Sequence, residues 1–198
     1  MAQRHLFAAF DVSRQVFYRT PLSIGIVNLK PLLPGHVLIV PRRVVPRLAD
    51  LEPSEVSDLF LAVQHVGKVL EEVYKVQAMT ISLQDGAVAG QSVPHVHIHL
   101  IPRHSTDYDG NSDEIYPKLE ESEAGLQTDL KTSDVPETDS DHSPPHKGKR
   151  RSGGPVDRAE DGDGVPRRRG MEVPKDADRR PRSMEEMEKE ANWLSGFF

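Results

Sequence analysis

Residues 95–103 read HVHIHLIPR, in which histidine alternates with aliphatic residues over the first six positions. Successive side chains of a β-strand point to opposite faces, so the pattern predicts a strand with three imidazoles on one face. Histidine is uncommon in half-buried strands, where β-branched and aromatic residues are favoured. Three imidazoles in register therefore indicate a chemical role, because this ring can act as nucleophile, proton carrier or hydrogen-bond donor near neutral pH.

The residues before this strand predict a small antiparallel sheet and one long helix. Apolar or alternating runs predict two short strands within residues 16–29, on either side of Thr20-Pro21, and further strands over 36–40 and 78–83. A helix is expected to begin at Pro53. Its core-facing stripe consists of Val56, Leu59, Phe60, Val63, Val66, Leu70, Val73 and Tyr74. Because strands dominate and only one connection is a long helix, we expect an α+β fold rather than a βαβ repeat.

Composition limits the classes of protein to consider. The 198 residues suffice for one domain of ordinary size. Residues 1–103 carry 10 of the 25 Lys and Arg residues and 8 of the 31 Asp and Glu residues, so the net charge of −6 arises downstream. Neither half indicates nucleic-acid binding through bulk charge. The absence of cysteine excludes disulfides, cysteine-based zinc sites and a thiol nucleophile.

Two expectations about the location of the protein follow from the same sequence. We find no signal peptide and no apolar run that approaches the ~20 residues needed to span a membrane. A soluble cytoplasmic protein without a membrane partner is therefore expected. Basic clusters within 147–151 and 167–169 also fit a nuclear-import signal, although solvated charge runs are the commoner explanation of such clusters.

The composition changes sharply after Tyr116. Residues 118–182 are crowded with Glu, Asp, Ser, Pro, Gly, Lys and Arg, and contain no aromatic residue. Such a segment buries too little apolar surface to offset its chain entropy, so we predict a disordered insertion over 118–182. Residues 183–198 predict a short helix that docks on the domain, because Ser183 and Glu186 form a capping box. The domain that carries the three histidines is then expected to span 1–117.

The histidines have two chemical interpretations, a metal site and a phosphate site, besides the ordinary one in which each is only a structural residue. Zinc requires ligand nitrogens at ~2.0–2.1 Å. His95 and His99 would begin roughly 13 Å apart on a strand, and no acidic partner is evident nearby, so metal binding by all three is disfavoured. Alternatively, the central imidazole attacks phosphorus while the flanking rings donate hydrogen bonds to the phosphoryl oxygens. The upstream loop Gly90-Gln91-Ser92 could present backbone amides to the same anion, so we favour the phosphate site.

These segments together resemble the histidine triad superfamily, and in particular its fragile histidine triad (Fhit) branch of dinucleoside triphosphate hydrolases. The similarity extends upstream through 28–31, 34–38 and 53–56, and downstream through 115–116 and the terminal helix that begins at Arg182-Ser183. It covers nearly the whole chain except 118–182. Gln84 before Asp85-Gly86, and Pro102-Arg103 after the histidines, favour the Fhit branch over the phosphoramidase branch. The matching core segments are Gln84-Asp85-Gly86, Ala89-Gly90-Gln91-Ser92-Val93 and the histidine strand.

The resemblance implies a role for each matched position. His97 would be the nucleophile that takes up a nucleoside monophosphate as a covalent intermediate, which water then releases. His99 and His36 would hydrogen-bond the phosphoryl group, and His95 would support the geometry of the site. The remaining substrate-binding positions would be Gln84 near the phosphates, Asn28 at the ribose, and Gly90, Gln91, Ser92 and Val93 in the loop that faces the phosphates. Only the resemblance assigns roles to Asn28, His36 and Gln84.

The resemblance also implies a reaction and an assembly. The substrate would be diadenosine triphosphate or a similar molecule, split into a nucleoside monophosphate and a diphosphate. A divalent ion, Mg²⁺ or Mn²⁺, would accompany the polyphosphate without a metal site of the protein's own. The family fold is an antiparallel five-stranded sheet with helices, extended across a homodimer. Two alternatives stay open: a phosphoramidase or adenylylsulfatase type of hydrolase, and a nucleotide-binding signalling module with slow turnover.

Overall fold

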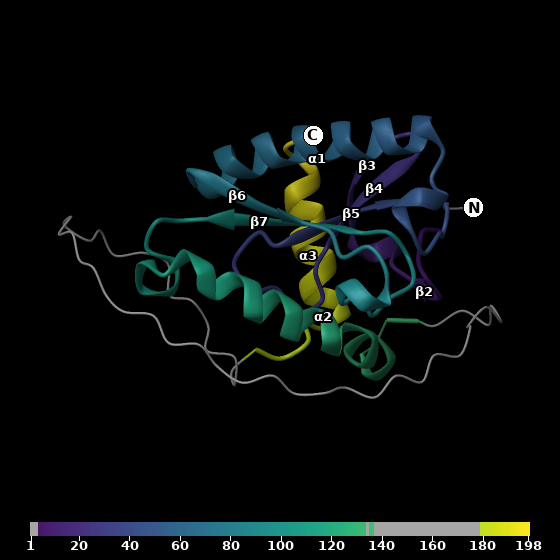
Figure 1. Ribbon diagram of the computed structural model, residues 1–198. Coiled ribbons are helices and arrows are strands. Elements are labelled where there is room, and N and C mark those ends of the chain that lie inside the picture. The colour runs from purple at the N-terminus through teal and green to yellow at the C-terminus, as the bar shows by residue number, and fades with distance from the viewer. Residues whose placement is uncertain (1–3, 134, 137–178) are drawn as a thin grey trace.

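An antiparallel sheet forms the centre of the molecule (Figure 1). The computed structural model describes residues 4–133, 135–136 and 179–198. Within them, five strands lie in the order β3-β4-β5-β7-β6, and every neighbouring pair is antiparallel. The strands are β3 (Val16–Arg19), β4 (Ser23–Val27), β5 (Val37–Pro41), β6 (Ala78–Ser82) and β7 (Ile98–Arg103). The predicted α+β fold is confirmed. A small hairpin of β1 (Leu6–Phe7) and β2 (Phe10–Asp11), which the sequence analysis did not anticipate, precedes the sheet.

The long helix α1 (Pro53–Tyr74) covers one face of this sheet (Figure 1) and begins at Pro53, as the sequence predicts. Pro53 opens it, since the first turn of a helix needs no amide hydrogen from that residue. Glu52 and Glu55 form a capping box, and the helix ends at Lys75, whose backbone is left-handed. The prediction is wrong for Phe60, which is 47% exposed. Phe60 lies about 100° around the helix from the buried Leu59, and this rotation takes it out of the core-facing stripe.

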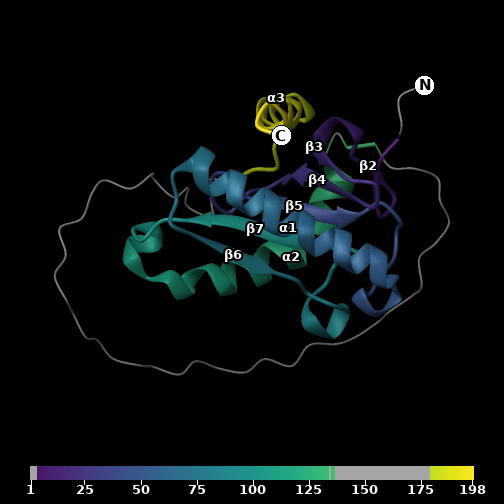
Figure 2. The same ribbon diagram turned by 90° about the horizontal axis from the view of Figure 1, so that it is seen from above.

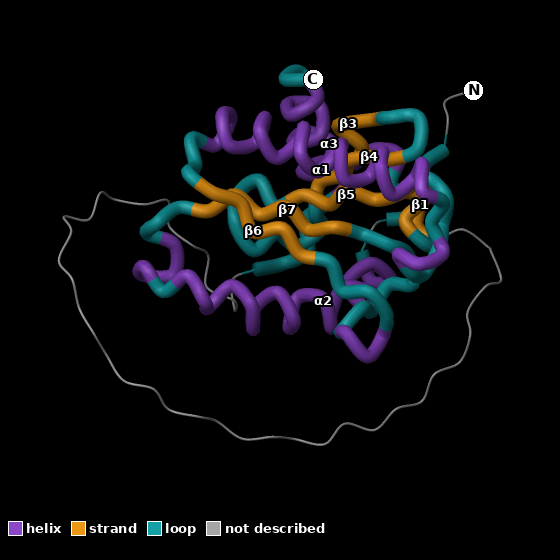
Figure 3. The backbone as a smooth tube through the Cα atoms, turned by 45° about the horizontal axis from the view of Figure 1, so that its top comes forward, coloured by secondary structure: helices purple, strands orange, loops and turns teal. Residues whose placement is uncertain are grey.

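A second helix, α2 (Ile115–Thr132), lies under the opposite face of the sheet (Figures 1 and 3). The prediction of disorder from residue 118 onward is therefore wrong for 118–132. Four apolar side chains fall on one face of this helix and are buried, and they are Ile115, Leu119, Leu126 and Leu130. The surrounding charged residues dominate the composition, but this single stripe buries enough apolar surface to order the helix. The rest of the predicted insertion, residues 137–178, lies outside the described residues.

The last helix, α3 (Met184–Ser195), stands at the β3 end of the sheet and is seen end-on in Figure 2. Ser183 accepts a hydrogen bond from the amide of Glu186, and the Glu186 side chain accepts one from the amide of Ser183. This is the capping box expected from the sequence. Met187 and Leu194 are buried against the main core. No helix among the described residues is long and apolar enough to cross a membrane.

A tight turn fixes where strand β5 begins. Gly35 has a φ of +78°, and a Cβ added to it would lie 2.6 Å from Tyr74 and 2.9 Å from Pro102. Only glycine satisfies both the left-handed backbone and the close approach. The turn delivers His36 to the start of β5, and β5 pairs with β7 so that Leu38 lies opposite His99. His36 and His99 thereby come from adjacent strands onto the same face.

Candidate active site

The three alternating histidines do not all lie on a strand. Only His99 belongs to β7, while His95 lies in a bend and His97 just before the strand. The prediction of three strand residues on one face is therefore wrong. The chain turns at Pro94, where the amide of His95 donates to the carbonyl of Val93 (2.8 Å). The bend takes the ring of His95 away from the other two and leaves His97 and His99 side by side, with ring centroids 5.2 Å apart.

The His95 ring is a buried structural group. Its Nδ1 accepts a hydrogen bond from the amide of Ala8 (3.0 Å), and its Nε2 donates to the carbonyl of Pro41 (2.9 Å). The ring stacks on Phe7 with a centroid separation of 5.6 Å. Burial, which disfavours the charged form, lowers the pKa of His95 to about 4. His95 contributes to the site through its backbone, because its carbonyl accepts a hydrogen bond from His97.

His97 has the tautomer that a nucleophile needs. Its Nδ1 lies 2.7 Å from the carbonyl oxygen of His95. A carbonyl only accepts hydrogen bonds, so Nδ1 carries the hydrogen and, in the neutral ring, Nε2 keeps its lone pair. The side chain is 1% exposed, and Phe7 packs edge-on against the ring at 5.3 Å. The backbone and Phe7 thus fix the direction in which Nε2 points.

His36 and His99 belong to a chain of hydrogen bonds in which each group donates to the next, from the Leu32 amide to His36 and from His36 to His99. The amide of Leu32 donates to His36 Nδ1 (3.1 Å), so the hydrogen of the neutral His36 ring is on Nε2. His36 Nε2 lies 2.9 Å from His99 Nδ1 and donates to it, which leaves the His99 hydrogen on Nε2. Burial lowers the pKa of both rings, and for His36 the neighbouring His99 lowers it further. His99 is thereby held as a neutral donor that faces the same space as His97.

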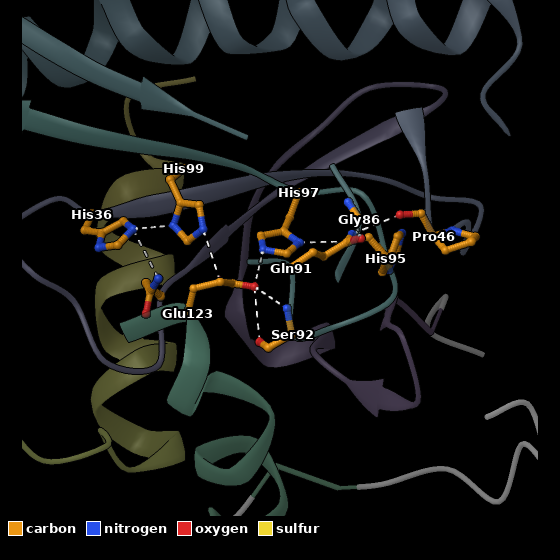
Figure 4. A network of polar contacts seen from close by, with 10 residues as sticks. His36, Pro46, Gly86, Gln91, Ser92, His95, His97, His99 and Glu123 are labelled. Carbon is orange, nitrogen blue, oxygen red and sulfur yellow. Dashed lines mark hydrogen bonds and ion pairs between the residues drawn. The ribbon is translucent and has the colours of Figure 1, made fainter. Parts of the chain in front are cut away.

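Glu123 of α2 occupies that space, and the sequence analysis missed it (Figure 4). Its Oε1 lies 3.2 Å from His97 Nε2, and its Oε2 lies 3.4 Å from His99 Nε2. The carboxylate is 1% exposed. Burial alone would raise its pKa, but the two histidines outweigh burial and hold the pKa well below its usual range. The signal in the sequence was a glutamate at position 123 within the apolar stripe of the helix.

The loop before the histidines contributes through Ser92. The amide and hydroxyl of Ser92 donate to Glu123 Oε1 at 3.1 and 3.2 Å. The side chain of Gln91 instead braces the loop, since it accepts from the amide of Gly86 and donates to the carbonyl of Pro46. Gly90 has a φ of +99°, which permits this loop conformation. Val93 is buried in the core and presents no polar side-chain atom to the site.

The remaining predicted residues line one side of the site. Asn28 is buried beside His36, with its Nδ2 3.3 Å from His36 Nε2, and its Oδ1 accepts from the amide of Lys30. Gln84 approaches the loop at Gly90, since a Cβ on Gly90 would meet Gln84 at 3.8 Å. The Oε1 of Gln84 is buried and makes no hydrogen bond within the described residues. The structure therefore gathers His97, His99 and Ser92 around one point, while His36 is hydrogen-bonded to His99 and Asn28 lies beside His36.

One group of three possible metal ligands occurs in the part of the chain that the structure describes. His97, His99 and Glu123 offer atoms that all lie within 4.8 Å of one another. An acidic partner for the histidines therefore exists, which corrects the expectation that none is nearby, because Glu123 is distant in sequence and close in space. Two imidazole nitrogens and one carboxylate do not suit Mg²⁺, which prefers oxygen ligands and retains its waters.

Comparison with known proteins agrees with this geometry. The HIT domain model matches residues 10–106. The asymmetrical bis(5'-nucleosyl)-tetraphosphatase of Schizosaccharomyces pombe is 46% identical over 198 residues, which is all of this chain and 96% of that protein. The chain belongs to the histidine triad family. A histidine triad protein of Arabidopsis thaliana, the bifunctional bis(5'-adenosyl)-triphosphatase/adenylylsulfatase, is 54% identical over 59% of this chain and 64% of its own length.

Solved structures of histidine triad proteins support the fold. The NitFhit protein of Caenorhabditis elegans is 44% identical with a TM-score of 0.52, and the match covers 62% of this chain and 30% of NitFhit. The diadenosine triphosphate hydrolase of Plasmodium falciparum, solved with cyclomarin A, is 32% identical with a TM-score of 0.52. That match covers 66% of this chain and 86% of the hydrolase.

Proposed function

We propose that this protein hydrolyses dinucleoside polyphosphates. The observation that carries the proposal is the meeting of His97 Nε2, His99 Nε2 and the Ser92 amide around a single anionic group, the Glu123 carboxylate. A nucleophilic nitrogen with hydrogen-bond donors beside it is what attack on a phosphoryl group requires. The names of the relatives from S. pombe and A. thaliana support the same class of substrate.

The proposed reaction has two displacements at one phosphorus. His97 Nε2 forms a bond to the terminal phosphorus of the substrate, and the bond from that phosphorus to the bridging oxygen breaks. The nucleoside diphosphate, or triphosphate from a longer substrate, leaves with the bonding electrons. His99 Nε2–H and the Ser92 amide and hydroxyl are placed to stabilise charge on the phosphoryl oxygens. Water then attacks the same phosphorus, releases the nucleoside monophosphate and returns His97 to its neutral form.

A divalent ion is proposed to travel with the substrate. Magnesium or manganese bound to the polyphosphate would screen its negative charge, as such ions do in other phosphate-transfer sites. None of the residues placed at the site offers a set of oxygen ligands for it. The proposal therefore assigns the ion to the substrate and gives no step to a metal site of the protein.

The preferred substrate could carry a triphosphate or a tetraphosphate chain, and these are two forms of the proposal. We infer diadenosine triphosphate as the preferred substrate from Gln84 and the Pro102-Arg103 exit of the histidine strand. The S. pombe relative, which matches along the whole chain, is named for the tetraphosphate, and the A. thaliana relative also for adenylyl sulfate. Competition among these three substrates at equal concentration ranks them by kcat/KM.

The test uses the full chain, diadenosine triphosphate and Mg²⁺, with separation of the nucleotide products. We expect adenylate and adenosine diphosphate in equal amounts from the wild type. His97→Asn should lower kcat/KM by about three orders of magnitude or more, because it removes the nucleophile. His65→Asn, at an exposed histidine on α1, is the matched control and should retain full activity. No adenylate from the wild type, or full activity of His97→Asn, would contradict the proposal.

The covalent intermediate has its own measurement. Substrate labelled at the terminal phosphorus is mixed with the enzyme and quenched with alkali, which preserves a phosphorus–nitrogen bond. Label should remain on the wild-type protein and be absent from His97→Asn. Turnover without any labelled protein during the first cycle would favour direct attack by water.

We also propose a homodimer in which β6 continues the sheet into a second copy. A sheet continues only through an edge strand, and the edges are β3 and β6. α3 packs along β3, whereas β6 exposes Ile81 at 53%. Phe60 and Leu61 of the overlying α1 are also exposed, at 47% and 65%. The free edge and these three apolar side chains support pairing on the β6 side.

A further inference from the structure

The carboxylate of Glu123 lies where the proposed reaction needs the phosphoryl group of the substrate. Its two oxygens contact His97 Nε2, His99 Nε2, and the amide and hydroxyl of Ser92, at 3.1–3.4 Å. These are the nucleophile and the oxyanion donors of the proposed mechanism. A carboxylate and a phosphoryl group both present negative oxygens to such donors, so both cannot occupy the site together.

We propose that α2 is an autoinhibitory helix, and that Glu123 is an internal substitute for the phosphoryl group which the substrate must displace. The proposal rests on the function proposed above, since it concerns the same site. It extends that function by giving the protein a closed state, with α2 docked, and an open state that binds dinucleoside polyphosphate. The occupant of the site in the closed state is a named residue of this chain.

Glu123 blocks the site in two ways. Its side chain fills the approach to Nε2 of His97, a residue that is 1% exposed with the helix docked. Its Oε1 also faces Nε2 at 3.2 Å, where a lone pair opposite a carboxylate oxygen would be repelled. The carboxylate oxygen therefore lies where a phosphorus atom would have to approach Nε2, and its negative charge opposes the entry of an anionic phosphoryl group.

The fit of the carboxylate is good enough to close the site but leaves it displaceable. Neither Nε2 atom makes a well-aligned hydrogen bond within the described residues, and neither does Glu123 Oε2, so these are polar contacts of moderate geometry. A planar carboxylate offers two oxygens to a site with donors in several directions. A phosphoryl group offers three and extends into a polyphosphate, which Glu123 would also repel electrostatically.

The apolar side chains that attach α2 to the sheet form two groups, one on each side of Glu123 along the helix. On one side, Ile115 and Leu119 pack in a small cluster with Leu32, Leu33 and Ile101, separate from the main core. On the other side, Leu126 and Leu130 join the main core, and Asp129 lies 3.5 Å from Lys30. The apolar contacts hold the helix in place, and the carboxylate is the part of it that competes with substrate.

The experiment compares three variants of the full chain: Glu123→Ala, Glu123→Gln and the matched control Glu121→Ala on the exposed face of α2. We measure kcat/KM for diadenosine triphosphate and the Kd of adenylate. If nine of ten molecules are closed, Glu123→Ala should raise kcat/KM and tighten adenylate binding by about tenfold, because only the open fraction binds. Glu123→Gln should move in the same direction, and Glu121→Ala should match the wild type.

The outcomes separate this proposal from the proposed function. Equal hydrolysis and equal adenylate binding by wild type and Glu123→Ala would overturn autoinhibition and leave the function intact. No hydrolysis by any variant, with tighter adenylate binding by Glu123→Ala, would overturn the function and support the substitute role of Glu123. Lower activity of Glu123→Ala with a normal unfolding temperature would overturn autoinhibition and make Glu123 part of the catalytic machinery.

Two further measurements guard against a misfolded variant and a bridging metal. Hydrogen exchange of the wild type should show faster exchange of α2 amides when adenylate is added, and unchanged or slower exchange there would contradict displacement. All assays are repeated after chelation of divalent metals, with Mg²⁺ then restored. If chelation alone brings the wild type to the activity of Glu123→Ala, a metal held by His97, His99 and Glu123 closes the site, and the direct contact proposed here is wrong.

Discussion

His95 and His36 are each held neutral by a backbone amide that points at the ring. The amide of Ala8 donates to His95 Nδ1, and the amide of Leu32 donates to His36 Nδ1. A second proton on either ring would face an N–H group and would be buried as well. Both effects favour the neutral form, and burial is the larger cause of the lowered pKa of each ring.

This arrangement predicts a loss of stability in mildly acidic solution. The pKa of His95 is about 4 in the folded protein, against 6.5 for the unfolded chain. Between these values the unfolded chain binds a proton that the folded protein does not, so the free energy of unfolding falls as pH falls. His95 alone should contribute about 3 kcal/mol across that window, and nothing further above its upper limit. His36 shifts in the same direction. Urea unfolding measured from neutral pH down to the folded-state pKa checks the slope.

Substitution isolates the contribution of one ring to this slope. His95→Gln keeps a side-chain donor near the carbonyl of Pro41 and does not titrate. Its unfolding free energy should depend less steeply on pH than that of the wild type, by about one proton at the steepest point. His65→Asn, at an exposed position, should keep the wild-type slope. Equal slopes for the wild type and His95→Gln would show that His95 is not the source.

Single residues also mark the limit of prediction from sequence. The alternating pattern correctly identified His97 and His99. Strand geometry also predicted His95 on the same face, and this was wrong because the chain bends at Pro94 instead of continuing the strand. Glu123 is 24 residues beyond His99 in sequence, and its meeting with the triad depends on where α2 docks. A charged residue within an apolar stripe was the local sign. Its partners depend on tertiary structure and were not readable from spacing.

At the scale of elements, α3 owes its start to a capping box that the sequence displays. Ser183 Oγ accepts from the Glu186 amide at 3.2 Å, and Arg180 holds the Glu186 side chain from outside. Ser183→Ala should lower the free energy of unfolding by about 1 kcal/mol, since it leaves an amide of the first turn without its acceptor. Chemical unfolding measures this. Ser195→Ala, at the exposed end of the same helix, is the control and should change stability little.

The sequence predicted helix α1 but not helix α2. In α1 the apolar stripe follows most of a helix of 22 residues that begins at a proline with a capping box, so the start and the buried face are marked in the sequence. In α2 no side-chain cap marks the start, and only four apolar residues form the stripe. Charged residues around them gave the composition of a disordered segment. Tertiary burial under the sheet, rather than local sequence, decides that α2 forms.

At the scale of the whole molecule, the sequence predicted antiparallel strands in an α+β fold, but the order β3-β4-β5-β7-β6 is known only from the structure, since the turns and lengths of these strands leave it open. The proposed dimer adds a contact that they do not specify. Ile81→Glu places a charge on the exposed side of β6 and should shift the protein from dimer to monomer. Sedimentation equilibrium measures the change. Val88→Glu, at a fully exposed residue of the short 3-10 helix Ala87–Ala89, is the control. A monomeric wild type, or a dimer unaffected by Ile81→Glu, would contradict pairing through β6.

Two backbone hydrogen bonds fasten the chain on either side of residues 137–178. The amide of Asp11 donates to the carbonyl of Pro136 (2.8 Å), and the amide of Arg182 donates to the carbonyl of Leu29 (2.9 Å). Both hydrogen bonds are made to strands or loops of the folded domain, so the domain itself sets where the chain leaves at Pro136 and where it returns at Arg182. A change in the length of 137–178 is therefore expected to leave both attachment points, and the docking of α3 that follows Arg182, in place.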